Sequence, residues 1–221
     1  MYQHVDHEGN VIALRPSKAV CVGQNYVAHM QEMGGAPVKQ AVLFNKPPSA
    51  FVSFDNGVAI PKGLGAVHYE LELALLISKP LKNASKAELN DAVWGYAAAL
   101  DLTLRDIQLE LKQRGHPWER AKAFDHSCVL SAFKPITCLS ELDDVSLQLK
   151  QNGAVKQQGS SQQMIRTIEM LLIEASQCFS LQAGDVLLTG TPAGVGPLEA
   201  GDKLALTVAD IELETEVVIS E

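Results

Sequence analysis

Short runs in which hydrophobic and polar residues alternate recur along the chain, separated by turn-forming glycine, proline, asparagine and aspartate residues. Such alternation is typical of half-buried strands, because successive side chains of a strand point to opposite faces. The pattern predicts strands over residues 13–23, 41–46, 67–77, 145–153, 184–190, 203–209 and 211–219. We therefore expect strands to outnumber helices.

Helical spacing of hydrophobic residues is found in four segments, at residues 25–33, 85–93, 102–115 and 161–177. These segments fall irregularly among the strands, whereas a doubly wound nucleotide-binding sheet needs a regular alternation of strand and helix. No internal repeat or low-complexity linker divides the chain. The sequence predicts one β-rich α+β domain over residues 1–221.

The predicted strand at residues 67–77 carries two acidic residues on one face. Its start alternates strictly, so His68, Glu70 and Glu72 share a side, and the Cα atoms of the two glutamates lie roughly 6.6–6.8 Å apart. Two like charges repel, and more strongly near a buried strand end, unless a cation or a proton intervenes. The segment alone fits two interpretations equally: a cation-binding pair, or the solvated outer face of an antiparallel strand.

A third acidic residue, Asp101, follows the run Val93–Leu100, which is too apolar for a surface loop. An acid there is expected to be buried and to need a partner. If a helix begins near Asp101, Arg105 and Gln108 share its face, and a structural Asp101–Arg105 ion pair is the alternative to metal ligation. Three carboxylates without a histidine or cysteine cluster favour Mg2+, Mn2+ or Ca2+ over zinc.

Composition narrows the class of protein. The formal net charge is −8, and the chain has no basic cluster that could bind nucleic acid. No hydrophobic run is long enough to cross a membrane, and the first residues lack signal-peptide and transit-peptide features, so we expect a cytoplasmic protein without a membrane partner. Reduced, mostly buried thiols are the simplest interpretation of the four cysteines, Cys21, Cys128, Cys138 and Cys178, because none has the neighbours of a thiolate nucleophile or soft-metal site.

Six motifs follow one another along the chain: Cys21–Tyr26 with His29 and Glu32, Leu43–Pro47, His68–Leu73, Leu100–Asp106, Lys122–Asp125 and Leu188–Gly196. Together they resemble the fumarylacetoacetate hydrolase family, from about residue 17 to the end of the chain. The resemblance is greatest to the small single-domain members that act on acylpyruvates and, in some relatives, decarboxylate oxaloacetate.

The resemblance implies a mixed β roll or sandwich with a few short helices, and a homodimer. It also implies that Glu70, Glu72 and Asp101 bind the metal, which agrees with the strand-face argument. The loop at residues 189–196 is rich in glycine but lacks the GK[ST] ending of a phosphate-binding loop, so no nucleotide or organic cofactor is expected.

His29 and Glu32 stand at i and i+3 of a predicted helix, a spacing that lets them touch but that also fits a solvated helix face. By resemblance they form a pair on a mobile lid, in which Glu32 orients His29 as the base that activates water. By the same resemblance Lys122 faces the metal and stabilises charge on a keto oxygen. The residues expected to hold the substrate are Arg105, Gln108 and Thr191.

The function that these residues favour is Mg2+-dependent hydrolysis of a carbon–carbon bond in acylpyruvates, which yields pyruvate and a carboxylic acid. Oxaloacetate decarboxylation is one alternative, because loss of carbon dioxide gives the same enolate of pyruvate. Isomerisation or hydration of dienoic keto acids is another. A metal-binding relative that has lost its activity is the non-enzymatic alternative.

Overall fold

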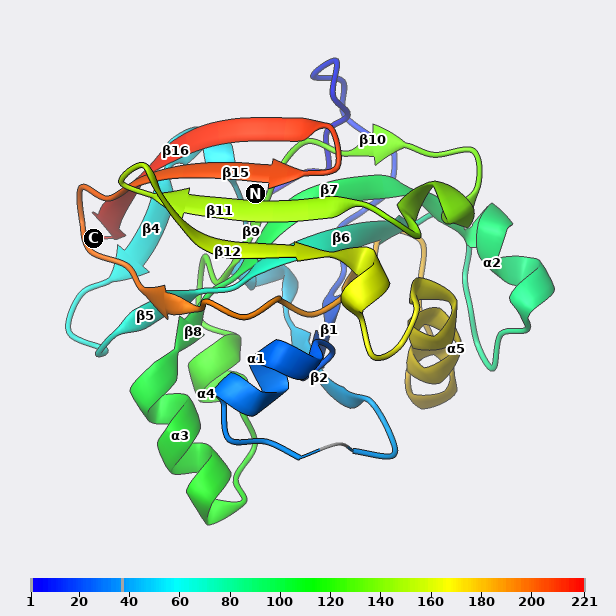
Figure 1. Ribbon diagram of the computed structural model, residues 1–221. Helices are drawn as coiled ribbons and strands as arrows, with labels where there is room; N and C mark the ends of the chain where they lie inside the picture. Colours follow the sequence, from blue (N-terminus) through cyan, green and yellow to red (C-terminus); the bar gives the residue numbers. More distant parts are fainter. Residues whose placement is uncertain (1, 37, 221) are drawn as a thin grey trace.

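The structure is a computed structural model that describes residues 2–36 and 38–220. The strands form an eight-stranded, a five-stranded and a three-stranded sheet, and the helices are few and short (Figure 1). This strand-rich arrangement of curled mixed sheets confirms the predicted α+β class, and within the described residues the sheets lack a doubly wound order.

The strands are β1 (Ala19–Gly23), β2 (Val42–Lys46), β3 (Phe51–Ser53), β4 (Val58–Pro61), β5 (Val67–Tyr69), β6 (Leu71–Ile77), β7 (Val93–Asp101), β8 (Thr103–Leu104), β9 (Cys128–Leu130), β10 (Lys134–Pro135), β11 (Ser146–Gln151), β12 (Ala154–Ser160), β13 (Val186–Leu188), β14 (Gly196–Pro197), β15 (Lys203–Val208) and β16 (Ile211–Ser220). The α-helices are α1 (Val27–Glu32), α2 (Lys86–Ala92), α3 (Arg105–Arg114), α4 (Glu119–Lys122) and α5 (Ile168–Cys178). Short 3-10 turns are η1 (Pro48–Ala50), η2 (Phe54–Asn56), η3 (Leu139–Leu142) and η4 (Ser161–Gln163).

Each of the seven predicted strand segments contains a strand, but the segment 67–77 is interrupted at Glu70, between β5 and β6. The expectation of a helix beginning near Asp101 is wrong. Asp101 ends β7, and Thr103 and Leu104 then pair with β5, so α3 begins only at Arg105. The fourth predicted helix begins late, at Ile168, where the Thr167 hydroxyl accepts a hydrogen bond from a backbone N–H of the first turn.

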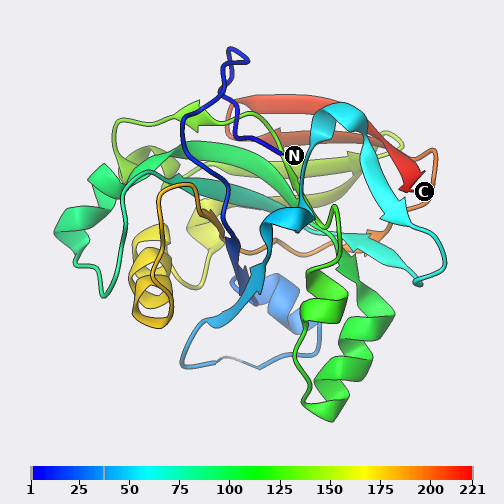
Figure 2. The same ribbon diagram turned by 180° about the vertical axis from the view of Figure 1, so that it is seen from behind.

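The two larger sheets pack face to face, with the five-stranded sheet (β12-β11-β15-β16-β4) over the middle of the eight-stranded sheet (β2-β1-β13-β6-β7-β9-β3, with β10 beside β7). Helices α1, α3 and α4 gather below the sheets in Figure 1, and α2 and α5 lie at one side. Figure 2 shows the N-terminal segment running across the back of the eight-stranded sheet.

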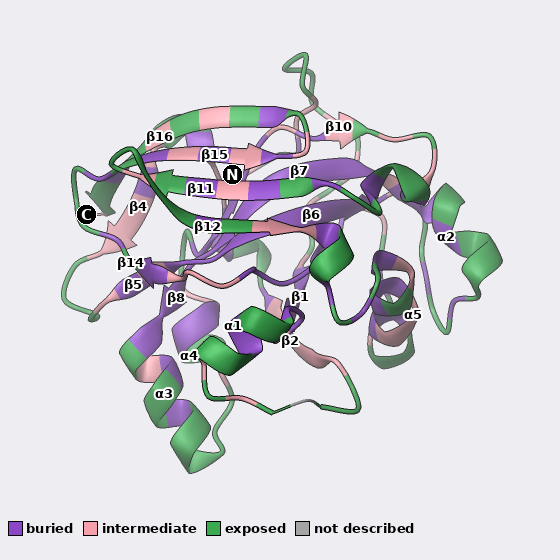
Figure 3. Ribbon diagram, viewed as in Figure 1, coloured by how far each residue is buried: buried purple, intermediate pink, exposed green. Residues whose placement is uncertain are grey.

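The two faces of β6 contribute to two different parts of the core. Leu71, Leu73 and Leu75 pack in the large cluster that includes strands of the five-stranded sheet, whereas Ala74 and Leu76 belong to the smaller cluster on the opposite face. Figure 3 shows β6 and β7 almost entirely buried, and Trp94 in β7 is the one residue of intermediate burial in these two strands. By strand alternation Glu72 therefore faces the side of the smaller cluster.

The eight-stranded sheet is curled. Strands β2 and β7 are separated by three others, which would put them roughly 19 Å apart in a flat sheet. Yet Nζ of Lys46, at the end of β2, lies 2.8 Å from Oδ1 of Asp101, at the end of β7. The curl therefore brings polar side chains from distant strands to one end of the sheet.

Candidate active site

The three predicted carboxylate ligands meet where β6 and β7 lie side by side. Glu72 is in register with Ala99, and the Asp101 N–H donates to the Glu70 carbonyl at 2.9 Å. One ligand atom of each carboxylate lies within 4.8 Å of those of the others. All three residues are 5% exposed or less, so the solvated-face interpretation of the two glutamates is wrong.

Two cations neutralise Glu70. Nζ of Lys122, at the end of α4, donates to Glu70 Oε2 at 2.8 Å and to Asp101 Oδ2 at 2.7 Å, and the Arg105 guanidinium pairs with Glu70 Oε1. Burial acts to raise the pKa of Glu70, but the two cations outweigh it and hold the pKa well below its usual value. The ion pair considered between Asp101 and Arg105 is not formed, because Arg105 pairs with Glu70 instead.

Glu72 has no cation within ion-pair distance among the residues that the structure describes. Its Oε2 accepts a hydrogen bond from the Gly190 N–H at 2.7 Å. Burial, followed by the negative charges of Asp101 and Glu70, raises the pKa of Glu72 well above its usual value. The buried Oδ1 of Asp101 receives no hydrogen bond from the described residues, although Lys46 lies at ion-pair distance. This concentration of carboxylate oxygens fits a hard divalent cation.

His29 and Glu32 form the predicted pair on α1. His29 Nδ1 lies 3.0 Å from Glu32 Oε2, and Glu32 Oε1 accepts from the Gly194 N–H at 3.1 Å. His29 is 6% exposed, so the histidine does not lie on a solvated helix face. With the Nδ1 proton donated to Glu32, Nε2 is the nitrogen left to act as a base.

Two of the predicted substrate-binding residues, Arg105 and Thr191, differ in whether their polar atoms already have hydrogen-bond partners. Arg105 donates to Gln108 Oε1 at 2.6 Å, and the buried Nε of Arg105 has no hydrogen-bond partner among the described residues. The Thr191 hydroxyl instead donates to the Leu71 carbonyl at 2.8 Å and accepts from Gln157 Nε2 at 2.8 Å. Thr191 could bind a substrate through its hydroxyl proton only by exchanging the bond to Leu71.

A cavity of about 40 Å³ opens onto this cluster. Five of the nine predicted site residues line it: His29, Glu70, Arg105, Gln108 and Lys122. The rest of its wall is largely apolar and aromatic, and consists of Gly23, Gln24, Met33, Phe44, Leu109, Lys112 and Trp118. The cavity therefore places a base, a carboxylate and the two buried cations Arg105 and Lys122 around a small space.

Three buried polar residues that support the site had no role assigned from the sequence. Asn25 donates to the Thr189 carbonyl at 2.9 Å and so ties the start of α1 to the glycine-rich loop. Gln157 holds Thr191, and Lys46 contacts Asp101. Asn25 and Lys46 lie inside the six motifs, whereas nothing in the pattern of β12 distinguishes Gln157 from its exposed neighbours.

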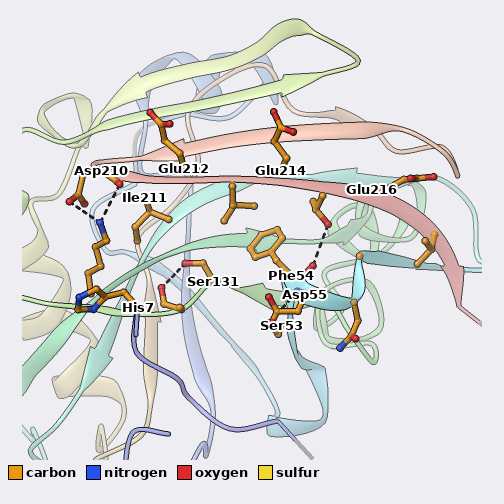
Figure 4. Close-up of a pocket in the computed structure, with 17 residues that line it drawn as sticks. His7, Ser53, Phe54, Asp55, Ser131, Asp210, Ile211, Glu212, Glu214 and Glu216 are labelled. Carbon is orange, nitrogen blue, oxygen red and sulfur yellow. Dashed lines mark hydrogen bonds and ion pairs between the residues drawn. The ribbon is translucent and has the colours of Figure 1, made fainter. Parts of the chain in front are cut away.

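A separate hollow of about 710 Å³ lies between β16, η2 and the segment before β10, and shares no lining residue with the carboxylate cavity. Figure 4 shows Glu212, Glu214 and Glu216 along β16, with Asp210 just before the strand and Asp55 on η2 opposite its middle. None of these acids belongs to the metal-ligating group found among the described residues.

The helices of the described residues are all too short or too polar to span a membrane.

Comparisons with known proteins agree with the motifs. The sequence pattern of the fumarylacetoacetate (FAA) hydrolase C-terminal family matches residues 18–218. Oxaloacetate tautomerase YcgM of Escherichia coli is 46% identical over 218 residues, which cover 98% of this chain and 100% of that protein. Human mitochondrial oxaloacetate tautomerase FAHD1 is 40% identical over 185 residues, 84% of each chain.

Two solved structures are also similar. A fumarylacetoacetate hydrolase family protein from Yersinia pestis superimposes with a TM-score of 0.96 at 44% identity, covering 98% of this chain and 100% of that one. Fumarylpyruvate hydrolase from Pseudomonas aeruginosa, solved with Mn2+ and pyruvate, gives a TM-score of 0.91 at 31% identity, covering 99% and 96%.

Proposed function

The chain belongs to the fumarylacetoacetate hydrolase C-terminal family, and from this premise we propose that it interconverts the keto and enol forms of oxaloacetate. The observation that carries the proposal is the convergence of His29, Lys122 and Arg105 on one cavity beside the three carboxylates. The names of the similar tautomerases favour oxaloacetate over the acylpyruvates that the sequence motifs put first.

The residues that would hold a divalent cation are Glu70, Glu72 and Asp101. Their all-oxygen donor set suits Mg2+ or Mn2+, and such an ion would act as a Lewis acid that draws electron density from the 2-oxo group of the acid. Glu72 supports this fit, since it is the carboxylate that no cation of the described residues neutralises. The Mn2+ in the similar fumarylpyruvate hydrolase is in keeping with it.

The chain's own residues supply the proton transfer. His29 Nε2 would remove a proton from the carbon next to the keto group, and Glu32 would stabilise the imidazolium that results. Two protons of the Lys122 ammonium are donated to Glu70 and Asp101, so the third is available for the oxygen on which negative charge develops. Arg105 lines the cavity, where its guanidinium would pair with a carboxylate of the substrate. Return of the proton to oxygen completes the enol.

The test is to follow the ultraviolet absorbance of enol oxaloacetate with purified protein and Mg2+ or Mn2+. We expect the protein to speed the approach to the keto–enol equilibrium, His29→Gln to lose at least 100-fold in kcat, and Lys122→Met to lose a similar factor. An exposed change such as Lys150→Met serves as the control. Wild-type protein that leaves the rate of equilibration unchanged with either metal would exclude the tautomerase.

Acylpyruvate hydrolysis is the second candidate, because the His29–Glu32 pair could also activate water. The similarity to a fumarylpyruvate hydrolase favours it at lower identity. Pyruvate release from a panel of acylpyruvates and from oxaloacetate separates the activities. His29→Ala should abolish hydrolysis while sparing some decarboxylation, and equal loss of both would contradict this division. Stabilisation by metal without turnover of any of these acids would indicate a non-catalytic relative.

We also propose a cytoplasmic location, and a homodimer on the strength of the family resemblance alone. Sedimentation at several protein concentrations would test the dimer, since a monomer at all of them would contradict it.

A further inference from the structure

Lys46 is a buried cation that the proposed chemistry leaves without a role. It ends β2 inside the motif Leu43–Pro47, and its side chain is fully buried. Because Phe44 packs in the smaller core cluster, strand alternation puts Lys46 on the same side of the sheet as the carboxylates. Buried lysines are rare unless paired, so this position needs an explanation.

The Lys46 ammonium is surrounded by oxygen atoms. It donates to the Ser127 carbonyl at 2.9 Å, to the Leu102 carbonyl at 3.3 Å and to the Lys122 carbonyl, and it lies 2.8 Å from Asp101 Oδ1. The residue after β7, the last residue of α4 and the residue before β9 thus converge on one side chain. The carbonyl of Lys122 is held from this side while its ammonium reaches Glu70 and Asp101 on the other.

These contacts have two separable consequences. The bonds to carbonyl groups fix the backbone from which Lys122 extends, which is a matter of geometry. The positive charge beside Asp101 opposes any second cation placed among the three carboxylates, which is a matter of electrostatics and would persist with a different cationic side chain.

We propose that Lys46 is a positioning residue that orients Lys122 and, through its charge, lowers the affinity of the carboxylate cluster for its divalent cation. The inference rests on the proposed metal-dependent function. A purely structural role for Lys46 predicts a different result. Removal of the Lys46 charge should strengthen metal binding and weaken turnover, whereas loss of a purely structural residue would weaken both.

The experiment compares Lys46→Met, Lys46→Arg and wild type after removal of metal with EDTA. Mn2+ binding is measured by calorimetry, and turnover of oxaloacetate is measured at saturating Mn2+. We expect Lys46→Met to bind Mn2+ at least tenfold more tightly and to lose at least tenfold in kcat with little change in KM. Lys46→Arg keeps the charge but cannot match the contacts of the ammonium, so it should keep wild-type Mn2+ affinity and still lose turnover.

Lys134→Met is the matched control, because it also removes one positive charge but pairs with Asp210 on the surface. It should leave both Mn2+ affinity and kcat unchanged. If Lys46→Met does not fold, as judged by circular dichroism, Lys46→Gln is the second neutral variant and carries the same expectations.

If the neutral variant binds Mn2+ only as tightly as Lys134→Met does, the proposed effect of the Lys46 charge on metal affinity is overturned. If its kcat is unchanged, the proposed orientation of Lys122 by Lys46 is overturned. A fall in both affinity and kcat would reduce Lys46 to a scaffold. Failure of the proposed function looks different, because wild-type protein itself would then neither bind Mn2+ nor turn over oxaloacetate.

Discussion

Replacement of Glu72 by glutamine should make the metal-free protein more stable. The ligand atoms of the three carboxylates lie within 4.8 Å of one another, and at an effective dielectric constant of about 20 one such repulsion is worth roughly 3.5 kcal/mol. Lys122 and proton uptake reduce this value. We therefore expect Glu72→Gln to raise the free energy of unfolding by about 1–3 kcal/mol at pH 7. The glutamine oxygen can still accept from Gly190.

The sign of the pH dependence follows from the raised pKa of Glu72. Above the ordinary glutamate pKa of about 4.5, the unfolded chain loses a proton that folded Glu72 retains, so wild-type stability falls as pH rises until the raised pKa is reached. The advantage of Glu72→Gln should thus grow with pH, by at most about 1.4 kcal/mol per unit. This part of the pH dependence comes from the proton that Glu72 keeps in the folded protein, so it should be absent in the variant.

Urea unfolding in EDTA between pH 5 and 8 measures both effects, with exposed Glu214→Gln as the control that should change stability by less than about 0.5 kcal/mol. Addition of Mn2+ at 1,000 times its Kd should reverse the order, since such a ligand stabilises the intact site by about 4.1 kcal/mol. A variant less stable than wild type in EDTA at pH 7 would refute the repulsion.

Three further outcomes are expected. Gly194→Ala should lower kcat at least tenfold, because at φ +98° its Cβ would lie 1.9 Å from a backbone oxygen and would move the N–H that holds Glu32 of the His29–Glu32 pair. Gly201→Ala is the control: it has φ +89° but open space around it, and should cost only about 1 kcal/mol of stability. Equal kcat in the two variants would contradict the link between Gly194 and the pair. Burial lowers the pKa of His4, so below pH 6.5 the unfolded chain takes up a proton that the folded chain does not. The free energy of unfolding that His4 contributes should therefore fall as pH falls below 6.5. Urea unfolding should show the stability difference between wild type and His4→Gln shrink by up to about 1.4 kcal/mol per pH unit. Thr191→Val should lose about 1–3 kcal/mol of stability with KM unchanged, whereas a higher KM at constant stability would indicate a substrate contact.

The alternating segments of the sequence were sufficient to locate eight of the sixteen strands that the described residues form, because half-buried strands carry their orientation in their own pattern. Strand β7 was harder, since Val93–Asp101 is buried on both faces and shows no alternation. The start of α3 was misplaced because the pairing of Thr103 and Leu104 with β5 is a tertiary contact that local spacing does not reveal.

The acidic cluster could be predicted because Glu70 and Glu72 stand two residues apart in one alternating segment and Asp101 ends a run too apolar for a surface loop, and the motifs added Lys122. Sequence could not predict that Lys122 pairs with two of these acids, or that Gln157 holds Thr191 from a strand 34 residues away. Such contacts depend on the curl of the sheet and on how loops return to it, which no local pattern encodes.

Strand β13 is made late but lies in the middle of its sheet, between β1 and β6. A growing chain on the ribosome would carry Glu70, Glu72 and Asp101 well before Val186–Leu188 emerged to join the first strand to the sixth. The Gly190 N–H that steadies Glu72 would be missing for the same interval. The carboxylate cluster should therefore be completed only after β13 has emerged, and long-range closure of this kind favours slow folding.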